Sequence, residues 1–367
     1  MPRTWDLIRD TIKRITPYSP GKSSKEVMEE LGLDEVIKLA SNENPLGPSP
    51  KAIEAMHEAV ENVHTYPDIA WRELAAALGD HLQMRPECIV VGRGSDEIIF
   101  MLCTTFIDEG DEVIFSEHPF AAYPLAVFQS GAVPVVVPRC DDFRHDLDAM
   151  AKAITDRTKI IYIPNPCNPT GTIITADEMD AFMRRVPDHV IVAFDEAYYE
   201  YVDDPDFPDC LQYARQGRKV VVLRTFSKAY GLAGLRVGYG ACAKSVADAL
   251  KLVVEPFNVS LVSQEAAIAA LEDRQHVEKS HEMVAEGREY LYGEFDRLGL
   301  QYVPSEANFV LVDTGVHSRE MFDGLMQQGV TIRTGDIWGL HTWIRVTVGT
   351  PEHNKKFIGA LEEILDG

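Results

Sequence analysis

The sequence lacks the long apolar segments that would place a protein in or across a membrane. No run among its 367 residues approaches the ~18 consecutive apolar residues of a membrane-spanning helix. The first stretch, Met1 to Ile15, alternates charged and apolar residues and has none of the apolar core of a secretory signal peptide. We therefore expect a cytoplasmic protein.

The sequence also lacks the cysteine and histidine spacings of disulfide frameworks and common metal sites. Its 6 cysteines are scattered without a Cys-x-x-Cys pair, which predicts free, buried thiols in a reducing compartment. The 11 histidines include no His-Glu-x-x-His motif, and His276 and His281 fall on an ordinary charged helix. We expect no bound metal.

Basic residues are few relative to acidic ones. The chain carries 35 Lys and Arg against 58 Asp and Glu, a formal net charge of −23. This excess argues against nucleic acid or an anionic membrane as a partner, although an anionic small molecule needs only a local cluster of donors. With 46% hydrophobic residues the chain can bury a sizeable core. Its length predicts about two domains of ~150 residues each.

Apolar runs and amphipathic stretches alternate between Cys88 and Tyr239, which predicts an α/β domain. Short apolar strands separated by helices build a mostly parallel sheet that is covered on both faces. A capping box at Thr175 and Glu178 marks the start of one of these helices. The expected strands are Ile89–Val91, Val113–Phe115, Val133–Val137, Ile160–Ile163, Val190–Phe194 and Val220–Leu223, and the expected helices include Asp96–Phe106 and Ala176–Val186.

A smaller α+β domain is expected after about residue 265, where the pattern changes. A long charged helix, roughly Val277 to Leu298, leads to strand-like runs at Phe309–Val312, Val330–Arg333 and Trp343–Val348. We therefore divide the chain into three parts: an N-terminal arm with part of the small domain (1–40), a large domain (41–265) and a small C-terminal domain (266–367).

The stretch from Arg224 to Arg236 brings an amine, a hydroxyl and a guanidinium to one edge of the predicted sheet. Strand Val220–Leu223 delivers Ser227 and Lys228 into a Gly-rich turn, and Arg236 opens the next apolar run. This set suits a cofactor with both an aldehyde and a phosphate, because the amine can form a Schiff base while the hydroxyl and guanidinium hold the phosphate. A surface lysine after a strand is the simpler alternative.

A glycine-rich turn from Val91 to Glu97 follows a strand and opens a helix. It resembles the start of a dinucleotide-binding fingerprint, but Glu97 stands where the third glycine would be. What remains is a tight turn with backbone N–H groups directed out of a helix N-terminus, a general cradle for phosphate. Ser95 or Asp96 acting as a plain helix cap would explain it equally well.

Two further strand ends carry polar groups of the kind that hold a pyridine ring. Asn168 lies in a rigid Pro-rich loop after Ile160–Ile163, where it can offer its amide to a ligand. Asp195 follows Val190–Phe194, and a buried carboxylate is costly unless it is paired; a protonated pyridine nitrogen is a suitable partner. Tyr198 can hydrogen-bond the ring oxygen. An ordinary turn at Asn168 and a helix-capping Asp195 are the alternatives.

Two arginines on the C-terminal strands are candidates for binding a substrate anion. Arg345 lies inside a strand-like run, where arginine is unusual unless it points into a site, and a bidentate grip on a substrate carboxylate is our interpretation. Arg333 ends the preceding strand and is a weaker second candidate, for which a surface position is nearly as good an explanation.

Taken together, these residues resemble the fold type I (aspartate-aminotransferase-like) pyridoxal-phosphate aminotransferases, and most closely the histidinol-phosphate aminotransferases. The matching motifs follow the family's order over nearly the whole chain. They are Tyr18-Ser19-Pro20-Gly21, Ser41-Asn42-Glu43-Asn44-Pro45, Tyr66-Pro67-Asp68, Gly94-Ser95-Asp96-Glu97, Asn168-Pro169-Thr170-Gly171, Ser227-Lys228-Ala229-Tyr230-Gly231, Ala307-Asn308-Phe309 and Arg345-Val346-Thr347-Val348-Gly349.

The resemblance implies a role for each matching residue. Lys228 would be the Schiff-base lysine and proton carrier, Asp195 would pair with the pyridine nitrogen, and Tyr198 with Asn168 would contact the ring oxygen. The other implied contacts are Ser95, Asp96, Ser227 and Arg236 with the cofactor phosphate, Phe120 with the ring face, Tyr66 with the phosphate of the neighbouring subunit, and Arg345, Arg333, Asn44 and Tyr18 with the substrate.

The resemblance further implies pyridoxal 5′-phosphate as cofactor, a homodimer with shared active sites, and a specific reaction. That reaction is amino transfer from L-histidinol phosphate to 2-oxoglutarate, in histidine biosynthesis. Two departures from the family pattern stand out: Arg93 replaces a common Asn and would add positive charge near the site, and His118-Pro119-Phe120 leaves Tyr123 as an alternative stacking residue.

Three other functions remain open at this stage. An aromatic amino-acid aminotransferase and a threonine-phosphate decarboxylase would use the same motifs. A nicotinamide-dependent dehydrogenase would explain the α/β pattern and the Gly92-Arg93-Gly94 turn, but it would leave Lys228 and Asn168 unexplained.

Overall fold

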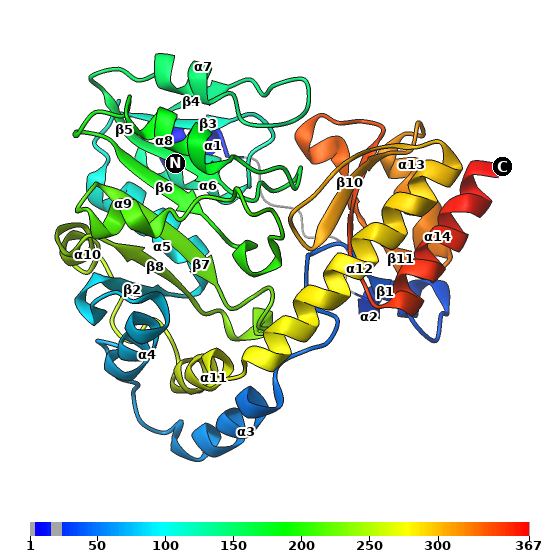
Figure 1. The fold of residues 1–367 in the computed structure, drawn as a ribbon, viewed down its shortest axis with the longest axis horizontal. Coiled ribbons are helices and arrows are strands. Elements are labelled where there is room, and N and C mark those ends of the chain that lie inside the picture. The colour runs from blue at the N-terminus through cyan, green and yellow to red at the C-terminus, as the bar shows by residue number, and fades with distance from the viewer. Residues whose placement is uncertain (1–3, 16–23, 367) are drawn as a thin grey trace.

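Two β-sheets, each with its own core, organise the protein. The computed structural model describes residues 4–15 and 24–366. The long helix α12 (Arg274–Leu298) runs from the helices of the larger sheet to the smaller sheet (Figure 1). The division of the chain near residues 40 and 265 stays a prediction, which this arrangement supports.

The larger sheet has seven strands in the order β2-β8-β7-β6-β5-β3-β4. All neighbouring pairs are parallel except those of β8, which is antiparallel to both β2 and β7. The strands are β2 (Ile89–Gly92), β3 (Glu112–Ser116), β4 (Val133–Val137), β5 (Thr158–Pro164), β6 (Ile191–Asp195), β7 (Val220–Thr225) and β8 (Gly238–Cys242). The predicted strands and the mostly parallel sheet are therefore confirmed.

Helices cover both faces of this sheet because its central strands are apolar on both sides. In β6, Val192 and Phe194 pack into one core while Ile191 and Ala193 pack into the other. Helices on the first face include α3 (Pro50–Ala59), α4 (Arg72–Leu82), α7 (Leu147–Lys152), α8 (Ala176–Met183), α9 (Leu211–Arg215) and α11 (Leu261–Leu271), and those on the second are α5 (Gly94–Phe106), α6 (Ala122–Ser130) and α10 (Lys244–Leu250). The predicted capping box at Thr175 is present, with its N–H donating to Glu178 Oε2 at 2.9 Å.

The sheet order argues against a dinucleotide-binding fold. The glycine-rich turn follows β2, which is an edge strand paired antiparallel to β8. In a dinucleotide fold the strand before this turn belongs to a parallel βαβ unit at the centre of the sheet. The dehydrogenase alternative therefore loses its structural basis.

The smaller sheet is antiparallel, in the order β12-β13-β10-β9. Its strands are β9 (Gln301–Val303), β10 (Phe309–Asp313), β12 (Arg333–Thr334) and β13 (Trp343–Thr347), and its helices, besides α12, are α13 (Ser318–Gln327) and α14 (Pro351–Asp366). A separate short pair joins β1 (Ile37–Lys38) to β11 (Val330–Thr331), next to α2 (Ser24–Leu31). The run 330–333, predicted as one strand, is thus divided between two sheets: Val330 and Thr331 pair with β1, whereas Arg333 pairs with β13.

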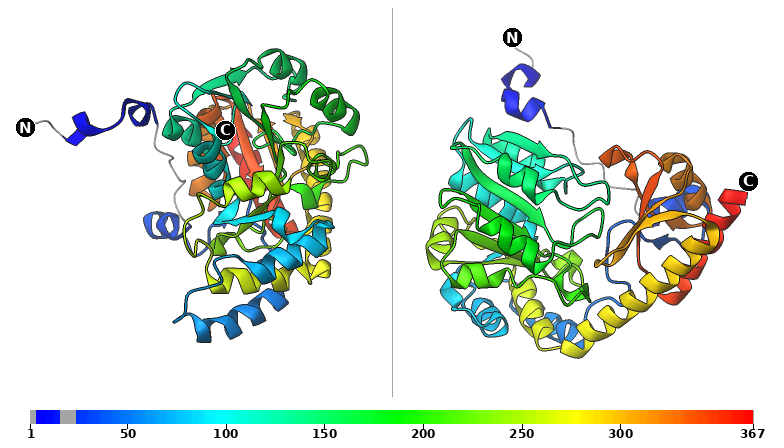
Figure 2. Two further views of the ribbon diagram at one scale, coloured as in Figure 1. Left: turned by 90° about the vertical axis from the view of Figure 1, so that its left-hand side faces the viewer. Right: turned by 45° about the horizontal axis from the view of Figure 1, so that its top comes forward.

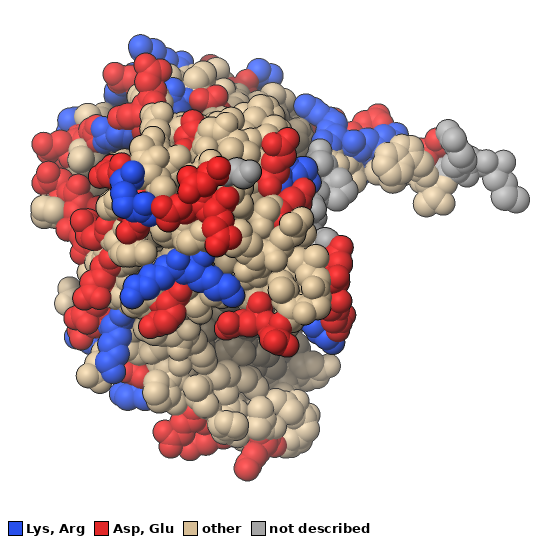
Figure 3. Space-filling model, turned by 90° about the vertical axis from the view of Figure 1, so that its right-hand side faces the viewer, with Lys and Arg blue, Asp and Glu red and all other residues tan. Residues whose placement is uncertain are grey.

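The N-terminal arm and the surface charge are the main features outside the two cores. The arm contains η1 (Thr4–Leu7) and α1 (Asp10–Lys13) and projects away from the body of the molecule (Figure 2). Trp5 and Leu7 on this arm are exposed. Acidic side chains spread over the face drawn in Figure 3, with Lys and Arg between them, in keeping with the net charge of −23. Within residues 4–15 and 24–366, every helix is too short or too polar to span a bilayer.

A buried ion pair links the ends of β6 and β7. Arg224 Nε and one terminal nitrogen donate to Glu196 Oε2 at 2.9 and 2.8 Å, and the guanidinium lies 3.4 Å from the centre of the Tyr199 ring. Both charged side chains are almost completely buried. Removing one member of such a pair leaves an uncompensated buried charge, which typically costs about 3–5 kcal/mol.

We therefore expect Arg224→Met to lower the free energy of unfolding by about 3–5 kcal/mol. Arg185→Met is the matched control, since Arg185 pairs with Asp148 at the surface and should cost no more than about 1 kcal/mol. Urea unfolding measures both. The double variant Arg224→Met/Glu196→Leu should recover much of the loss; equal midpoints for the two single variants would contradict the argument.

Candidate active site

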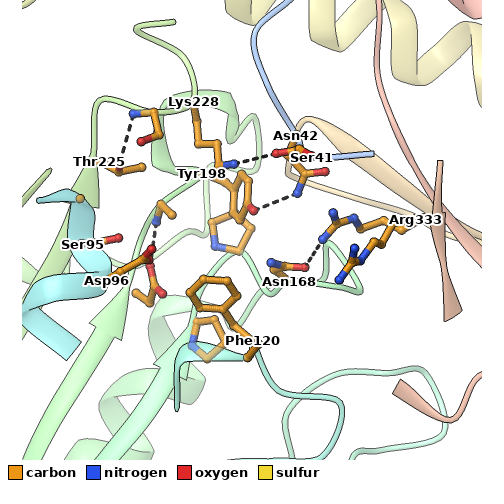
Figure 4. Close-up of a pocket in the computed structure, with 18 of the residues that line it drawn as sticks. Ser41, Asn42, Ser95, Asp96, Phe120, Asn168, Tyr198, Thr225, Lys228 and Arg333 are labelled. Carbon is orange, nitrogen blue, oxygen red and sulfur yellow. Dashed lines mark hydrogen bonds between the residues drawn. The ribbon is translucent and has the colours of Figure 1, made fainter. Parts of the chain in front are cut away.

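A pocket lies between the two sheets, at the carboxyl ends of β5, β6 and β7 (Figure 4). Its opposite wall comes from β13 and from η6 (Gly335–Trp338), a short 3₁₀ helix that connects β12 to β13 in the smaller sheet. Open α/β sheets bind ligands at the carboxyl ends of their strands, so this position agrees with the fold. Eleven of the residues singled out in the sequence line it: Ser95, Asp96, Phe120, Asn168, Asp195, Tyr198, Ser227, Lys228, Arg236, Arg333 and Arg345.

One end of the pocket forms a cradle for an anion. The N-terminus of α5 meets Arg236 there, whose guanidinium donates to Ser227 Oγ at 3.3 Å and lies 3.4 Å from Asp96 Oδ2. Two glycines permit this close approach: a Cβ on Gly238 would lie 2.4 Å from Ser95 N, and one on Gly94 would lie 2.7 Å from an Arg236 nitrogen. Backbone N–H groups, a hydroxyl and a guanidinium together suit a phosphate.

Asp195 lies on the floor of the pocket as a buried carboxylate. It is 6% exposed, and it accepts hydrogen bonds from Tyr123 Oη at 2.7 Å and from the N–H of Ala197 at 3.3 Å. Burial raises the pKa of Asp195 to about 6, against the lowering effect of the Tyr123 hydroxyl. A cationic partner in the pocket would remove this penalty.

Lys228 projects into the pocket from the turn after β7. Its Nζ donates to the carbonyl of Ser41 at 3.0 Å and lies 5.7 Å from the centre of the Tyr198 ring. Burial, together with the charge of Arg345, lowers the pKa of Lys228 to about 8. The amine is therefore closer to its neutral, nucleophilic form at physiological pH than an exposed lysine is.

Asn168 and Tyr198 are held by partners that the sequence analysis did not assign. The Asn168 Oδ1 accepts from Arg345, which leaves the Asn168 NH₂ group directed away from that arginine. Tyr198 Oη accepts from Asn42 Nδ2 at 2.9 Å, and burial raises the pKa of Tyr198 to about 12. In Figure 4, Tyr198 lies next to Lys228, and Asn168 lies nearer to Phe120 and Arg333. Asn168 and Tyr198 can both donate a hydrogen bond to a ligand oxygen.

Two arginines face the pocket from neighbouring strands. Arg333 in β12 and Arg345 in β13 are direct cross-strand partners, and both line the pocket. Arg345 also donates to the carbonyl of Ala40 at 2.9 Å, and its guanidinium lies 5.4 Å from the Trp338 ring. This side of the pocket therefore offers positive charge to a substrate anion, within a protein that is acidic overall.

Phe120 and Tyr123 are the two candidates for stacking on the ring of a ligand, and their contacts distinguish them. Tyr123 is 1% exposed, stacks on Tyr162 with ring centres 4.7 Å apart, and directs its hydroxyl to Asp195. Phe120 forms part of the pocket wall and meets the edge of Tyr123 at 5.7 Å. Both side chains line the pocket, but the Tyr123 hydroxyl donates to Asp195 and its ring stacks on Tyr162, which leaves Phe120 as the ring available for stacking on a ligand.

Two of the predicted site residues that the structure describes, and one predicted charge, do not line this pocket. Asn44 is buried elsewhere and donates to the carbonyl of Ala229 at 2.8 Å, while Asn42, two residues earlier, lines the pocket. Tyr66 is 81% exposed and stacks on Phe257, and Tyr18 lies outside the described residues. The Arg93 side chain forms ion pairs with Glu97 and Glu255 at 3.1 and 2.9 Å. Its positive charge is therefore balanced by these carboxylates, and Arg93 does not line the pocket.

Ile337 and Trp338 are pocket residues that the sequence analysis missed. They lie in η6, between the strands that carry Arg333 and Arg345. The only available signal was an aromatic residue in the loop between two strands that each carry an arginine. Tyr123 as the partner of Asp195 was also missed, since it was considered only as a stacking residue.

Pyridoxal phosphate fits the donor set of the pocket. The anion cradle at α5 matches its phosphate, Asp195 lacks a cation among the described residues close to it and matches a protonated pyridine nitrogen, and Lys228 matches its aldehyde. Phe120 supplies an aromatic face for the ring. The three polar groups belong to different elements, so their convergence is a property of the folded chain.

Comparisons with known proteins give the same picture. The chain is 51% identical over 358 residues to a histidinol-phosphate aminotransferase of Moorella thermoacetica, covering 97% of this chain and 92% of the relative. It is 45% identical to one of Akkermansia muciniphila, covering 96% and 97%. A crystal structure of the histidinol-phosphate aminotransferase of Sinorhizobium meliloti in complex with pyridoxal-5′-phosphate matches with a TM-score of 0.89 and 28% identity, covering 98% of this chain and 97% of that one.

The match to a family model extends over most of the chain. Residues 34–361 match the family described as aminotransferase class I and II. This range includes both sheets and every pocket residue named above. The chain belongs to the class I and II aminotransferases, with their aspartate-aminotransferase-like fold.

Proposed function

We propose that this chain is a pyridoxal-phosphate-dependent aminotransferase that transfers the amino group of L-histidinol phosphate to 2-oxoglutarate, in histidine biosynthesis. The observation that carries the proposal is that the amine of Lys228 lines the same pocket as the buried carboxylate of Asp195 and the two arginines, Arg333 and Arg345. The names of relatives that are 45–51% identical support the choice of substrate.

The cofactor, when bound, supplies an aldehyde for the amine of the substrate and a conjugated ring that withdraws electrons from the amine-bearing carbon. Lys228 Nζ takes the proton from that carbon and holds it, which requires the neutral amine that burial favours. Asp195 would keep the pyridine nitrogen protonated, and Tyr198 and Asn168 would donate to the ring oxygen; all three line the pocket. Ser95, Asp96, Ser227 and Arg236 would hold the phosphate, and Phe120 would stack on the ring.

Arg345 and Arg333 would bind the anionic group of each substrate in turn. Histidinol phosphate presents a phosphate and no carboxylate, whereas glutamate and 2-oxoglutarate present carboxylates. Guanidinium groups bind both kinds of anion in bidentate fashion. Because the same pocket serves an amino donor and then a 2-oxo acid, the kinetics should be ping-pong.

A homodimer with shared active sites is part of the proposal. Tyr66 is 81% exposed and outside its own pocket, as expected of a residue that serves the phosphate site of a neighbouring subunit. Its ring stacks on that of Phe257, which is also exposed, with ring centres 4.4 Å apart. Paired exposed aromatic rings of this kind are typical of an interface. Tyr18, implied to contact the substrate phosphate, stays a prediction.

The test is a single-turnover absorbance assay on the holoenzyme with separate amino donors. L-Histidinol phosphate should discharge the visible band of the lysine-bound cofactor at least about tenfold faster than L-phenylalanine, because L-phenylalanine lacks the phosphate that the site is proposed to bind. Faster reaction with L-phenylalanine would instead indicate an aromatic amino-acid aminotransferase. Release of carbon dioxide from O-phospho-L-threonine would indicate a decarboxylase.

A further inference from the structure

Two histidines and an aspartate converge on the outer side of η6, outside the active-site pocket. His317 immediately precedes α13, Asp336 lies in η6, and His341 lies in the loop before β13. Their ligand atoms all lie within 4.8 Å of one another, and among residues 4–15 and 24–366 this is the one His/Cys/Asp/Glu group with that property. The aminotransferase reaction proposed above uses none of the three.

The distances are close to those of a coordinated metal ion. Asp336 Oδ1 lies 3.5 Å from His341 Nδ1 and 3.9 Å from His317 Nε2. Metal–nitrogen and metal–oxygen bonds of about 2.0–2.2 Å in a tetrahedral site place neighbouring ligand atoms about 3.4 Å apart. His341 is therefore already near that separation from Asp336. The half-exposed imidazole of His317 has to approach Asp336 by about half an ångström, and its ligand nitrogen lies within 4.8 Å of that of His341.

Backbone and side-chain hydrogen bonds hold the three ligands on one scaffold. Ser318 Oγ donates to Asp336 Oδ1 at 2.8 Å, and the Ser318 N–H donates to the carbonyl of His341 at 2.7 Å. The N–H of Gly339 donates to the carbonyl of Asp336 at 3.0 Å, which closes η6. Outer hydrogen bonds of this kind orient metal ligands and fix the position of the site.

Two contacts of the unliganded group would change when a metal binds. His317 Nδ1 accepts a long 3.3 Å hydrogen bond from the N–H of Arg319. Coordination through Nε2 places the ring proton on Nδ1, so that weak bond is exchanged for a metal–nitrogen bond. Arg319 Nε lies 3.4 Å from Asp336 Oδ2, but its side chain is 69% exposed and can turn towards solvent.

We propose that His317, Asp336 and His341 bind one divalent transition-metal ion. Two imidazoles, a carboxylate and a fourth position open to water are a ligand set for Zn²⁺, Co²⁺ or Ni²⁺. The ion would join the start of α13, η6 and the loop before β13. Because Ile337 and Trp338 follow Asp336 directly and line the active-site pocket, it would also fix one wall of that pocket. The sequence analysis found no short motif because the ligands are 19 and 5 residues apart.

Metal titration of the holoenzyme tests the proposal without reference to activity. Chelator-treated enzyme should take up one equivalent of Zn²⁺ per chain in competition with a chromophoric chelator. Co²⁺ should give visible bands of a site with nitrogen ligands. His341→Ala and the isosteric Asp336→Asn should each weaken binding at least about tenfold. His341 is 68% exposed, so its replacement should leave folding intact.

His281→Ala is the matched control. His281 pairs with Asp203 at 2.9 Å, and among the described residues no second histidine joins that pair, so its removal should leave Zn²⁺ binding unchanged. Uptake of less than about one equivalent by the unmodified protein would overturn the proposal. So would a binding curve for His341→Ala that superimposes on that of the unmodified protein.

Discussion

Replacing Lys228 with alanine should lower the turnover number by at least about 10³-fold. In the proposed function, the substitution removes both the amine that captures the cofactor aldehyde and the group that moves the substrate proton. Proton transfer by a positioned side chain alone typically contributes 10²–10⁴-fold. Rapid-quench or steady-state assay of purified protein with L-histidinol phosphate and 2-oxoglutarate measures the loss.

Two matched variants separate the nucleophile from the charge. Lys228→Arg keeps a cation in the pocket but cannot form an imine at neutral pH, so it should be nearly as inactive as Lys228→Ala. Lys244→Ala removes an exposed lysine that pairs with Asp248, one turn along its own helix, and should keep full activity. A Lys228→Arg variant that retains more than about a tenth of the activity would contradict the assignment of Lys228 as nucleophile and proton carrier.

The pH dependence of cofactor capture gives an independent check on Lys228. Burial lowers the pKa of its amine to about 8 in the empty pocket. Only the neutral amine attacks an aldehyde, so the rate at which apoenzyme combines covalently with the cofactor should rise through about pH 8 and level off above it. A rate that still rises towards pH 10 would mean that the amine titrates like an exposed lysine.

The fold of the large sheet could be predicted from the sequence because its signals are local. Most strands of that sheet are short apolar runs, and the central ones are buried on both faces, so the strand positions followed from composition. The run 330–333 was predicted wrongly as one strand, since nothing in these four residues indicates that the first two pair with β1 and the last with β13. The antiparallel direction of β8 was likewise not predictable, because strand direction depends on the path of the connecting chain.

The candidate site likewise contains residues that could be predicted from the sequence and residues that could not. Lys228, Asp195 and Asn168 could be found because each stands at the end of a recognisable strand or loop motif. Trp338 could not, since its place in the pocket depends on how the small sheet packs against the large one. The group of His317, Asp336 and His341 could not be predicted either, because its members are separated in the sequence and only the folded η6 brings them together.

Replacing Asp195 with asparagine should lower the turnover number by about 10²–10³-fold, the usual loss when one preorganised electrostatic partner is removed. The neutral amide cannot hold a proton on the pyridine nitrogen, so the ring withdraws electrons less well from the substrate. The substitution is isosteric: Tyr123 can still donate to the amide oxygen, and only the longer 3.3 Å hydrogen bond from the N–H of Ala197 loses its acceptor. Asp148→Asn, at an exposed carboxylate, is the control and should change nothing.

The same substitution should have the opposite effect on the stability of the apoenzyme. Burial raises the pKa of Asp195 from 3.8 to about 6 in the folded protein. A carboxyl group with a raised folded-state pKa adds stability below pH 4 relative to higher pH, and that contribution is lost as the pH rises through about 6. At pH 8 the ionised Asp195 should therefore destabilise the apoenzyme by at most about 3 kcal/mol, a penalty that the neutral amide of the Asp195→Asn variant avoids.

Urea unfolding of both proteins at pH 4 and pH 8 therefore distinguishes a binding group from a structural one. Without cofactor, Asp195→Asn should be more stable than the unmodified protein at pH 8, by about 1–3 kcal/mol, and equal to it at pH 4. With cofactor bound the order should reverse at pH 8, because only the carboxylate gains an ion pair. If the variant is less stable at pH 8 in both forms, Asp195 contributes to folding, and its pairing with a cationic ring is wrong. If the order reverses, the cofactor stabilises the protein through the carboxylate of Asp195, although the same ionised carboxylate lowers the stability of the apoenzyme.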